Sequence, residues 1–418
     1  MQFSRFLHNE AVTVGEMAQT AIARTKRAVV GREILVIQDS SELVFGGKKI
    51  RARGFGPVGK GGNLSGLLLH LPLAVDAMNG AVLGPVDIQV FNRPPGRPAP
   101  RRKRPTSQKE SQRWIDGMMK AAELSQAASI TVVADRESDI YEEFACRPAH
   151  VHLITRVAQG HRLVRKPQQE GVQGDRKEQA LSAFVDALPE QGRFTTTIPA
   201  APGRQERESE LILRYSTIEL CKPRNGAAAD LPKTVSLTVV DVREASKPAQ
   251  GEALHWCLLT THTVENVKNA RMIIDFYRRR WTIEEYFHTL KTAGFDIEAA
   301  QLEDPEAMAR LVGAAACAAV TVMQLLRARD GRSDQALEEV FETEDIPLLE
   351  AISAQHEGKT ARQKNPHPKR SLAYATWVVA RLGCWDGYYG KPGPLVLRRG
   401  LQDFHRIKYG YDLRLQHV

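Results

Sequence analysis

The chain has 418 residues, too many for one ordinary hydrophobic core, so we expect two or three domains. A hydrophobic share of 42% excludes a wholly disordered protein. Lys and Arg exceed Asp and Glu by 58 − 49 = 9, and such a basic balance favours a polyanionic partner, nucleic acid before a membrane surface.

Cysteine spacing and the length of the apolar runs indicate the cellular compartment of the protein. The five cysteines are far apart, without a CxxC pair or nearby paired histidines, which argues against a disulfide framework and a structural zinc site. The N-terminus has no apolar stretch of signal-peptide length. The longest uncharged apolar segment, 311–326, is shorter than the roughly 18 to 20 residues of a membrane span. We expect a soluble, cytoplasmic protein with no membrane partner and a core helix at 311–326.

The first 150 residues have an α/β pattern. Strand-like runs at 34–37, 66–75 and 86–91 are separated by Gly- and Pro-rich segments, as connections between strands usually are. A helical segment at 111–124 precedes a further strand at 129–133. Strands, a helix and then a buried-looking strand indicate an α/β domain.

The middle of the chain, from about 153 to 261, is different. Short β-rich runs alternate with polar loops and no long helix is evident, which predicts a mostly β insertion. Helices are expected again at 264–293 and 305–329. The basic, proline-rich run 97–104 is predicted to be an exposed loop, with or without a partner.

One helical segment carries residues suited to chemistry. Tyr277, Arg280, Glu284 and Lys291 have offsets of 0, 3, 7 and 14. At about 100° per residue they fall within roughly 60° of one another on a helix. Cations beside a carboxylate suit a site that holds a metal ion and phosphate oxygens. An ordinary amphipathic helix with ion pairs four residues apart gives the same pattern, so spacing alone leaves both interpretations open.

The pattern Y-x2-R-x3-E-x6-K resembles the signature of the IS4 family of bacterial DDE transposases, the family that includes Tn5-like transposases. Asp39 in IQDSSEL and Asp135 in VVADRESDIY, each expected at the end of a strand, resemble the two aspartate segments of that family. The resemblance implies an α/β, RNase H-like catalytic core, with a mixed sheet flanked by helices, a mostly β insertion and an α-helical C-terminal region. The expected parts are an N-terminal helical remnant (1–30), the core (31–155 and 261–335), the insertion (156–260) and a dimerisation-like region (336–418).

The resemblance also implies the catalytic residues. Asp39, Asp135 and Glu284 are expected to be catalytic and to hold two Mg²⁺ or Mn²⁺ ions. We hypothesise that Asp39 bridges the ions while Asp135 and Glu284 each hold mainly one. Hard carboxylate oxygens suit such ions, which serve the attacking and leaving oxygens of phosphodiester cleavage.

Further residues are expected, by resemblance, to bind DNA. Tyr277, Arg280 and Lys291 correspond to residues that grip phosphates beside the scissile bond. Trp256 corresponds to a tryptophan of the insertion that stacks on a flipped base, and Arg156 to an arginine that contacts DNA.

The implied function is DNA transposition in the bacterial cytoplasm, at the nucleoid. A homodimer would cleave double-stranded DNA at transposon ends and join these ends to target DNA. Relatives carry an N-terminal DNA-binding domain before the first aspartate, whereas only 38 residues precede Asp39 here. The alternative is therefore an N-terminally truncated, end-binding-deficient protein that inhibits full-length copies by dimerisation. A general RNase H-like nuclease is a weaker third hypothesis.

Other residues compete for these roles. Alternation along a strand predicts Glu137 on the same side as Asp135, whereas Glu285 is about 100° from its neighbour Glu284. The GxGxxG match at 54–59 contains a proline and precedes a strand, so we interpret it as a basic glycine loop instead of a dinucleotide site. We expect His70 and Trp281 to be core residues.

Overall fold

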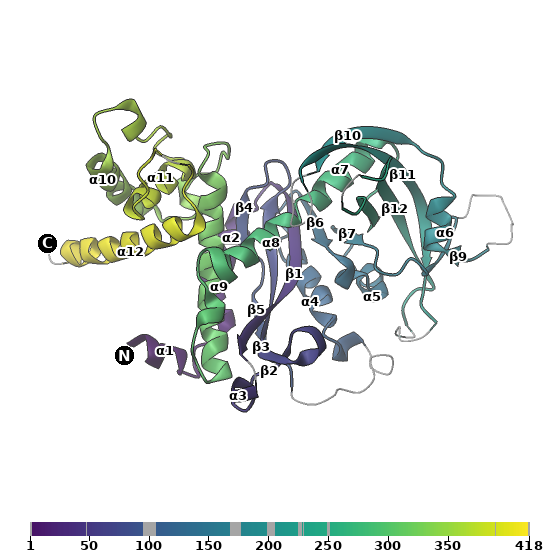
Figure 1. Ribbon diagram of the computed structural model, residues 1–418, viewed down its shortest axis with the longest axis horizontal. Coiled ribbons are helices and arrows are strands. Elements are labelled where there is room, and N and C mark those ends of the chain that lie inside the picture. Colours follow the sequence, from purple (N-terminus) through teal and green to yellow (C-terminus); the bar gives the residue numbers. More distant parts are fainter. Residues whose placement is uncertain are drawn as a thin grey trace.

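A computed structural model describes residues 2–46, 48–94, 106–167, 177–198, 205–224, 228, 230–248, 251–388 and 390–416. The basic run 97–104 lies outside the described residues. Within them the chain forms one continuous mixed sheet with helices on both faces and a separate group of C-terminal helices (Figure 1). This architecture confirms the predicted α/β, RNase H-like fold class.

The strands are β1 (Glu33–Gly46), β2 (Gly56–Val58), β3 (Leu64–Asp76), β4 (Val82–Pro85), β5 (Gln89–Phe91), β6 (Ser129–Ala134), β7 (Val151–Arg156), β8 (Leu163–Arg165), β9 (Gln179–Ala180), β10 (Gly192–Ile198), β11 (Arg207–Cys221), β12 (Thr234–Glu244) and β13 (His255–Thr260). Their order across the sheet is β2-β3-β1-β6-β7-β13-β12-β11-β8-β9, with β4 and β5 on β3 and β10 on β11. The β1–β6 and β6–β7 pairs are parallel, and the other pairs are antiparallel.

The helices are α1 (Gln2–Leu7), α2 (Val14–Ala28), α3 (Lys48–Arg51), α4 (Gln112–Ala122), α5 (Tyr141–Ala145), α6 (Leu181–Asp186), α7 (Val267–Arg278), α8 (Trp281–His288), α9 (Pro305–Ala328), α10 (Ile346–His356), α11 (Leu372–Leu382) and α12 (Pro394–Gln416). A π-helical segment, Thr289–Ala293, directly continues α8.

Strand β1 shows why the sheet is covered on both faces. Leu35 and Ile37 belong to the core shared with α8 and α9, whereas Ile34 and Val36 belong to the core shared with α4 and α5. Successive side chains of a strand point to opposite faces, so an unbroken apolar run requires helices on both sides. Burial of this run places β1 at the centre of the molecule.

The β-rich insertion extends the core sheet. Thr260 of β13 pairs with Ile154 of β7, and β12, β11 and β10 follow in antiparallel order. Figure 1 shows α7 enclosed by this curved part of the sheet. In the part of 156–260 that the structure describes, the longest helix is α6, with six residues. The insertion therefore places β13 directly beside β7.

Helix α9 confirms the helix predicted at 305–329 and extends beyond the apolar run 311–326 at both ends. Its 24 residues, with a mean hydropathy of 1.7 in the most apolar window, are long and apolar enough to cross a membrane, yet 61% of that window is buried inside the protein. One end of α9 packs in the core of the sheet, and Val322, Leu325 and Ala328 pack with the C-terminal helices. We interpret α9 as the core helix that joins the two parts.

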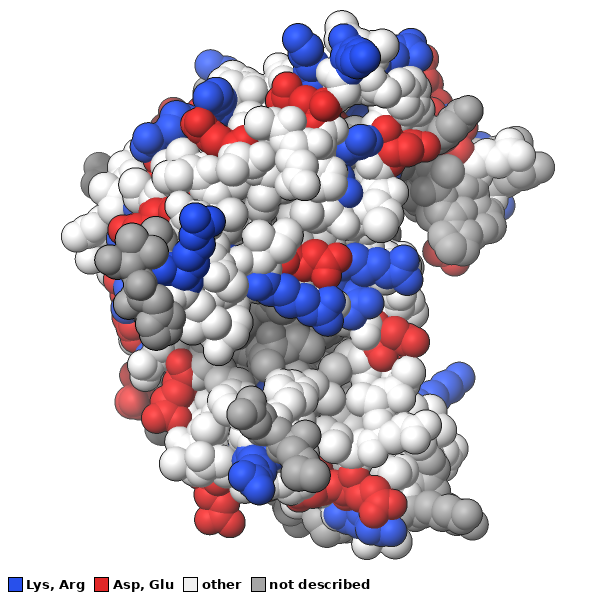
Figure 2. Space-filling model, turned by 90° about the vertical axis from the view of Figure 1, so that its left-hand side faces the viewer, with Lys and Arg blue, Asp and Glu red and all other residues white. Residues whose placement is uncertain are grey.

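The C-terminal helices form the end of the molecule from which α12 projects (Figure 1). Figure 2 views the protein from this side, with Lys and Arg gathered across the middle of the face and Asp and Glu among them. The net charge of +9 is therefore not a uniform positive surface on this face. Attraction of a polyanion to this face therefore depends on where the individual Lys and Arg side chains lie.

Candidate functional site

Asp39 and Asp135 lie at the same level of neighbouring strands. The parallel pairing of β1 with β6 ends at Ile37 and Val133, two residues before each aspartate. Asp135 directly follows β6, as predicted. Asp39 does not end its strand: β1 continues to Gly46 because residues 38–46 remain paired with β3. The aspartate thus lies where its parallel neighbour ends, within a longer strand.

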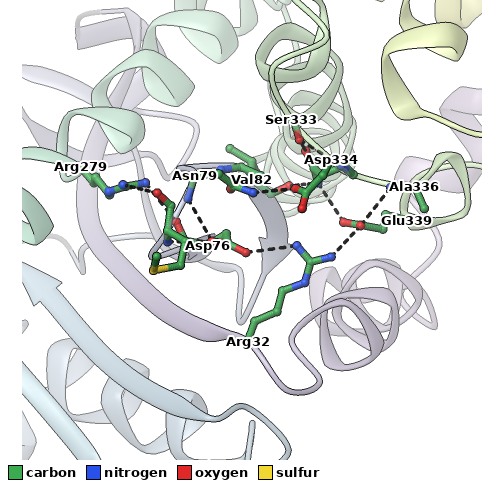
Figure 3. A network of polar contacts seen from close by, with 12 residues as sticks. Arg32, Asp76, Asn79, Val82, Arg279, Ser333, Asp334, Ala336 and Glu339 are labelled. Carbon is green, nitrogen blue, oxygen red and sulfur yellow. Dashed lines mark hydrogen bonds and ion pairs between the residues drawn. The ribbon is translucent and has the colours of Figure 1, made fainter. Parts of the chain in front are cut away.

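The predicted single helix over 264–293 is wrong in detail. The observed segment consists of α7, α8 and the π-helical segment. Arg279 and Arg280 lie between α7 and α8, and although their backbones are helical they do not join the two into one regular helix. Arg279 donates hydrogen bonds to the carbonyls of Asp76 at 3.2 Å and Met78 at 2.8 Å (Figure 3). At Gly80, φ is 77°, and a Cβ would lie 2.8 Å from Arg279 Nη1. The turn after β3 therefore anchors the start of α8.

This anchor is part of a larger polar network. Arg32 lies between Asp76, at 3.2 Å, and Glu339, at 2.9 Å (Figure 3). Asn79 of the same turn donates to Asp334 at 2.8 Å. The turn that holds α8 is thus linked to the start of the C-terminal region.

Arg280 is the centre of the site. Its guanidinium lies 3.3 Å from Asp39 Oδ2 and 4.0 Å from Asp135 Oδ2, and it also forms a hydrogen-bonded ion pair with Glu284. The residue is 8% exposed. Three carboxylates from a central strand, from the end of the next strand and from a helix therefore converge on one cation.

Three further predicted residues surround Asp135. The Tyr277 hydroxyl donates to Asp135 Oδ1 at 3.2 Å, and Arg156 Nη1 lies 4.0 Å from the same oxygen. The ring of Trp256 packs edge-on against Tyr277, with 5.3 Å between centroids. The insertion therefore contributes an aromatic and a cationic side chain to the edge of the site.

Lys291 contacts β1 further along the strand than Arg280 does. It lies in the π-helical segment, where the Gly294 amide donates to the carbonyl of Thr289 at 2.9 Å. This wider turn changes the direction of the side chains that follow. Lys291 Nζ donates to the carbonyl of Glu42 and lies 3.6 Å from Glu298. The helix places Tyr277, Arg280 and Glu284 together, and Lys291 beside the continuation of β1.

Burial shifts the pKa values of Asp39 and Tyr277 in the site. Burial raises the pKa of Asp39 to about 6, although a 2.8 Å hydrogen bond from the Ser40 amide and the charge of Arg280 oppose this rise. Glu137 and Asp135 add to the rise through like charge. Burial likewise raises the pKa of Tyr277 to about 12, so this hydroxyl is a hydrogen-bond donor at neutral pH.

The competing acidic residues occupy other positions. Glu137 is exposed in a 3-10 turn after β6, so the alternation predicted from a strand does not apply. It lines a cavity of about 400 Å³ with Ser40 and Arg113, among others. Glu285 pairs with Arg327 of α9 at 2.6 Å, away from the site.

His70 and Trp281, both predicted to be core residues, differ in their exposure to solvent. His70 is fully buried, its Nδ1 lies 2.9 Å from Ser40 Oγ, and burial lowers its pKa to about 3. Trp281 was predicted to be a core residue, which is wrong, since it is 51% exposed. It occupies the first position of α8, directly after the junction, and faces solvent.

The donor chemistry of the site fits divalent metal ions. Asp39, Asp135 and Glu284 supply hard oxygens that converge on one positive charge, as the ligands of Mg²⁺ or Mn²⁺ do. Among the described residues, no three Asp, Glu, His or Cys side chains are close enough together to hold an ion as they stand, because Arg280 lies among these carboxylates.

Sequence comparison agrees with this geometry. A family model described as a transposase DDE domain matches residues 97–321, which is more than half of the chain. The match includes Asp135, Glu284 and the whole insertion, whereas Asp39 lies before it.

Proposed function

Since the chain belongs to the family of proteins with a transposase DDE domain, we propose that it cleaves DNA at transposon ends and joins these ends to target DNA, as an IS4-like, Tn5-like enzyme. The observation that carries the proposal is the convergence of Asp39, Asp135 and Glu284 on Arg280. A strand, a neighbouring strand end and a packed helix hold these carboxylates, so their positions are fixed by the fold.

The carboxylates Asp39, Asp135 and Glu284 would hold two Mg²⁺ or Mn²⁺ ions. When bound, the ions supply charge that activates the attacking water or 3′-hydroxyl and stabilises the leaving oxygen. Asp39, on the central strand β1, would contribute to holding them. Arg280, released from the carboxylates, pairs with a phosphate, for which a guanidinium fork is well suited.

The DNA strand is proposed to lie along the insertion side of the site. Trp256 packs on the buried ring of Tyr277 beside Asp135, so the pair offers a base the partly exposed ring of Trp256. Base stacking on such a ring is largely independent of sequence. Arg136 and Arg156 line a cavity of about 190 Å³ with Arg243 of β12. These guanidiniums provide phosphate contacts on the side where the aromatic pair receives a base.

We also propose a homodimer formed through the C-terminal helices. The projecting part of α12 exposes Ile407, Tyr409, Tyr411 and Leu413 by 39%, 68%, 36% and 40%. Large apolar side chains gathered on one helix are typical of interaction sites. Sedimentation of the wild type and of Ile407→Asp, with and without DNA, tests this; a wild type that remains monomeric on DNA would exclude the dimer.

The catalytic proposal is tested by metal-dependent cleavage of DNA that carries the ends of the element. Asp39→Asn, Asp135→Asn and Glu284→Gln should each lose cleavage while they still bind the DNA in gel shifts. Glu285→Gln is the matched control, because Glu285 is the next residue of the helix and pairs with Arg327 outside the site. Wild-type cleavage by any of the three variants would remove that residue from the site.

A further inference from the structure

A buried polar cluster joins the two segments that carry Asp39 and Asp135. Glu143 of α5 is 1% exposed, and Gln38 and Ser138 are fully buried. Gln38 Nε2 donates to Glu143 Oε1 at 3.2 Å, and the Ser138 hydroxyl donates to Glu143 Oε2. One carboxylate therefore holds strand β1 and the turn after β6 at a fixed separation.

Each partner of Glu143 is one link away from an aspartate. Gln38 directly precedes Asp39 in β1, and its side chain points to the opposite face of the sheet. The Ser138 amide donates to the carbonyl of Asp135 at 3.0 Å. The contact through Glu143 thus lies behind the sheet, while both aspartates face Arg280 in front of it.

The surroundings leave Gln38 little freedom. Its Nε2 also donates to the carbonyl of Trp114 in α4 at 3.3 Å. Gly117 of the same helix provides the space for the amide, since a Cβ there would lie 2.3 Å from Gln38 Oε1. The Gln38 side chain is therefore held between α4 and Glu143.

Stability alone does not account for a carboxylate at this place. Burying a carboxyl group is costly unless its hydrogen bonds compensate, and apolar side chains of similar volume often stabilise a core as well or better. Burial raises the pKa of Glu143 to about 8, which shows how unfavourable this environment is for charge. What the carboxyl group adds is a defined distance between two polar partners.

The far side of the same segment is fixed by another carboxylate. Asp139 accepts hydrogen bonds from the amides of Ala158 at 2.9 Å and Gln159 at 3.2 Å, directly after the strand that carries Arg156. Asp135 is therefore held between β1 on one side and the end of β7 on the other.

We propose that Glu143 is a positioning residue, which fixes the separation of Asp39 and Asp135 through Gln38 and Ser138 and thereby sets the affinity of the site for divalent ions. The inference rests on the proposed function, since it takes the two aspartates as metal ligands. Glu143 itself touches neither ion nor DNA.

The test measures Mn²⁺ binding to the full chain by electron paramagnetic resonance, without DNA. Glu143→Met keeps the volume and removes both hydrogen bonds, and we expect its dissociation constant for Mn²⁺ to rise about 10- to 100-fold, the usual effect of losing a residue that orients metal ligands. Glu143→Gln should bind Mn²⁺ like the wild type, because its amide can accept from Gln38 and donate to Ser138. Ser138→Ala, a milder change, should show a smaller rise in the same direction.

The matched control is Glu244→Met in β12. Glu244 is also a buried carboxylate, which accepts from the Leu254 amide and pairs with Arg207, far from the aspartates in the sheet order. It should lose thermal stability without a change in Mn²⁺ affinity. Wild-type affinity in both Glu143→Met and Ser138→Ala, or an equal loss in Glu244→Met, would overturn the inference.

Asp39→Asn separates this inference from the proposed function. If Asp39→Asn binds Mn²⁺ like the wild type, the assigned metal ligands are wrong and both ideas fail. If Asp39→Asn loses Mn²⁺ while Glu143→Met and Ser138→Ala retain it, the ligands stand and only the positioning role is refuted.

Discussion

Replacing Arg280 by methionine removes the cation on which three carboxylates converge. Removing one partner of a fully buried ion pair costs about 3 to 5 kcal/mol, whereas an exposed pair contributes about 0.2 to 1 kcal/mol. Arg280 is 8% exposed, and the side chains of Asp39, Asp135 and Glu284 are 26%, 32% and 36% exposed. Solvent therefore relieves part of the repulsion, and we expect the free energy of unfolding without metal to fall by about 2 kcal/mol.

Divalent ions should reverse this loss. A ligand that binds only the native state adds about 2.7 kcal/mol at a concentration 100 times its dissociation constant. In Arg280→Met the ion no longer displaces a guanidinium, so Mn²⁺ should stabilise the variant more than the wild type, although the variant loses cleavage.

Urea unfolding in EDTA and in Mn²⁺ measures both effects. Arg327→Met is the control, because it removes the ion-pair partner of Glu285, which lies in α8 next to Glu284. This variant should lose the same free energy of unfolding in both buffers. The reasoning is refuted if Arg280→Met is as stable as the wild type in EDTA, or if it gains less from Mn²⁺.

Three further outcomes follow from the structure. The pKa of Glu143 is raised from 4.5 to about 8, so the proton that it binds stabilises the native state. This contribution is full below about pH 4.5 and is lost as the pH rises to about 8, by up to about 5 kcal/mol. Urea unfolding across this pH range should show a smaller loss of stability for Glu143→Gln. Lys291→Ala should reduce by about 1 the slope of log affinity for DNA against log salt, if this lysine leaves the Glu42 carbonyl to contact a phosphate; an unchanged slope in gel shifts would assign Lys291 to the fold alone. Trp281→Ala should change the free energy of unfolding by less than about 0.5 kcal/mol, since the side chain is 51% exposed, and a larger loss in urea would contradict its exposed position.

The sequence predicted the fold class and the elements that carry the site, because apolar runs and helix spacing are local properties. It did not predict that Asp39 lies within a strand. The pairing of residues 38–46 with β3 depends on a partner about 30 residues away, and the polar residues at 38–41 interrupt the apolar pattern of the strand. Tertiary pairing outweighed local composition here.

The helix was predicted as one piece for a similar reason. A spacing argument assumes a constant 100° per residue, and the carbonyls of Asp76 and Met78 that hold Arg279 cannot be read from the helix itself. Tyr277, Arg280 and Glu284 still meet at one site across the junction, and the regular helix ends at His288, before the π-helical segment that carries Lys291. The exposure of Trp281 has the same origin, because its direction depends on the junction.

Glu143 was missed altogether. Two adjacent glutamates at 142 and 143 in a polar segment read as a solvated surface, and no spacing distinguishes the buried one. The available signal is that the pair lies between Tyr141 and Phe144, both of which are buried. A carboxylate between apolar residues of a short helix can indicate a buried hydrogen bond to a neighbouring polar residue.

The place of Arg280 also explains how one helix can carry a cation in an acidic site. Without ions, three carboxylates near one another repel, and the guanidinium offsets their charge. On the proposed function, DNA and divalent ions would supply the missing partners, since phosphates would attract Arg280 and the ions would attract the carboxylates. In such an exchange the guanidinium and the carboxylates would each face an opposite charge before and after binding. Arg280 therefore offsets the acidic charge of the site as long as no ligand is bound.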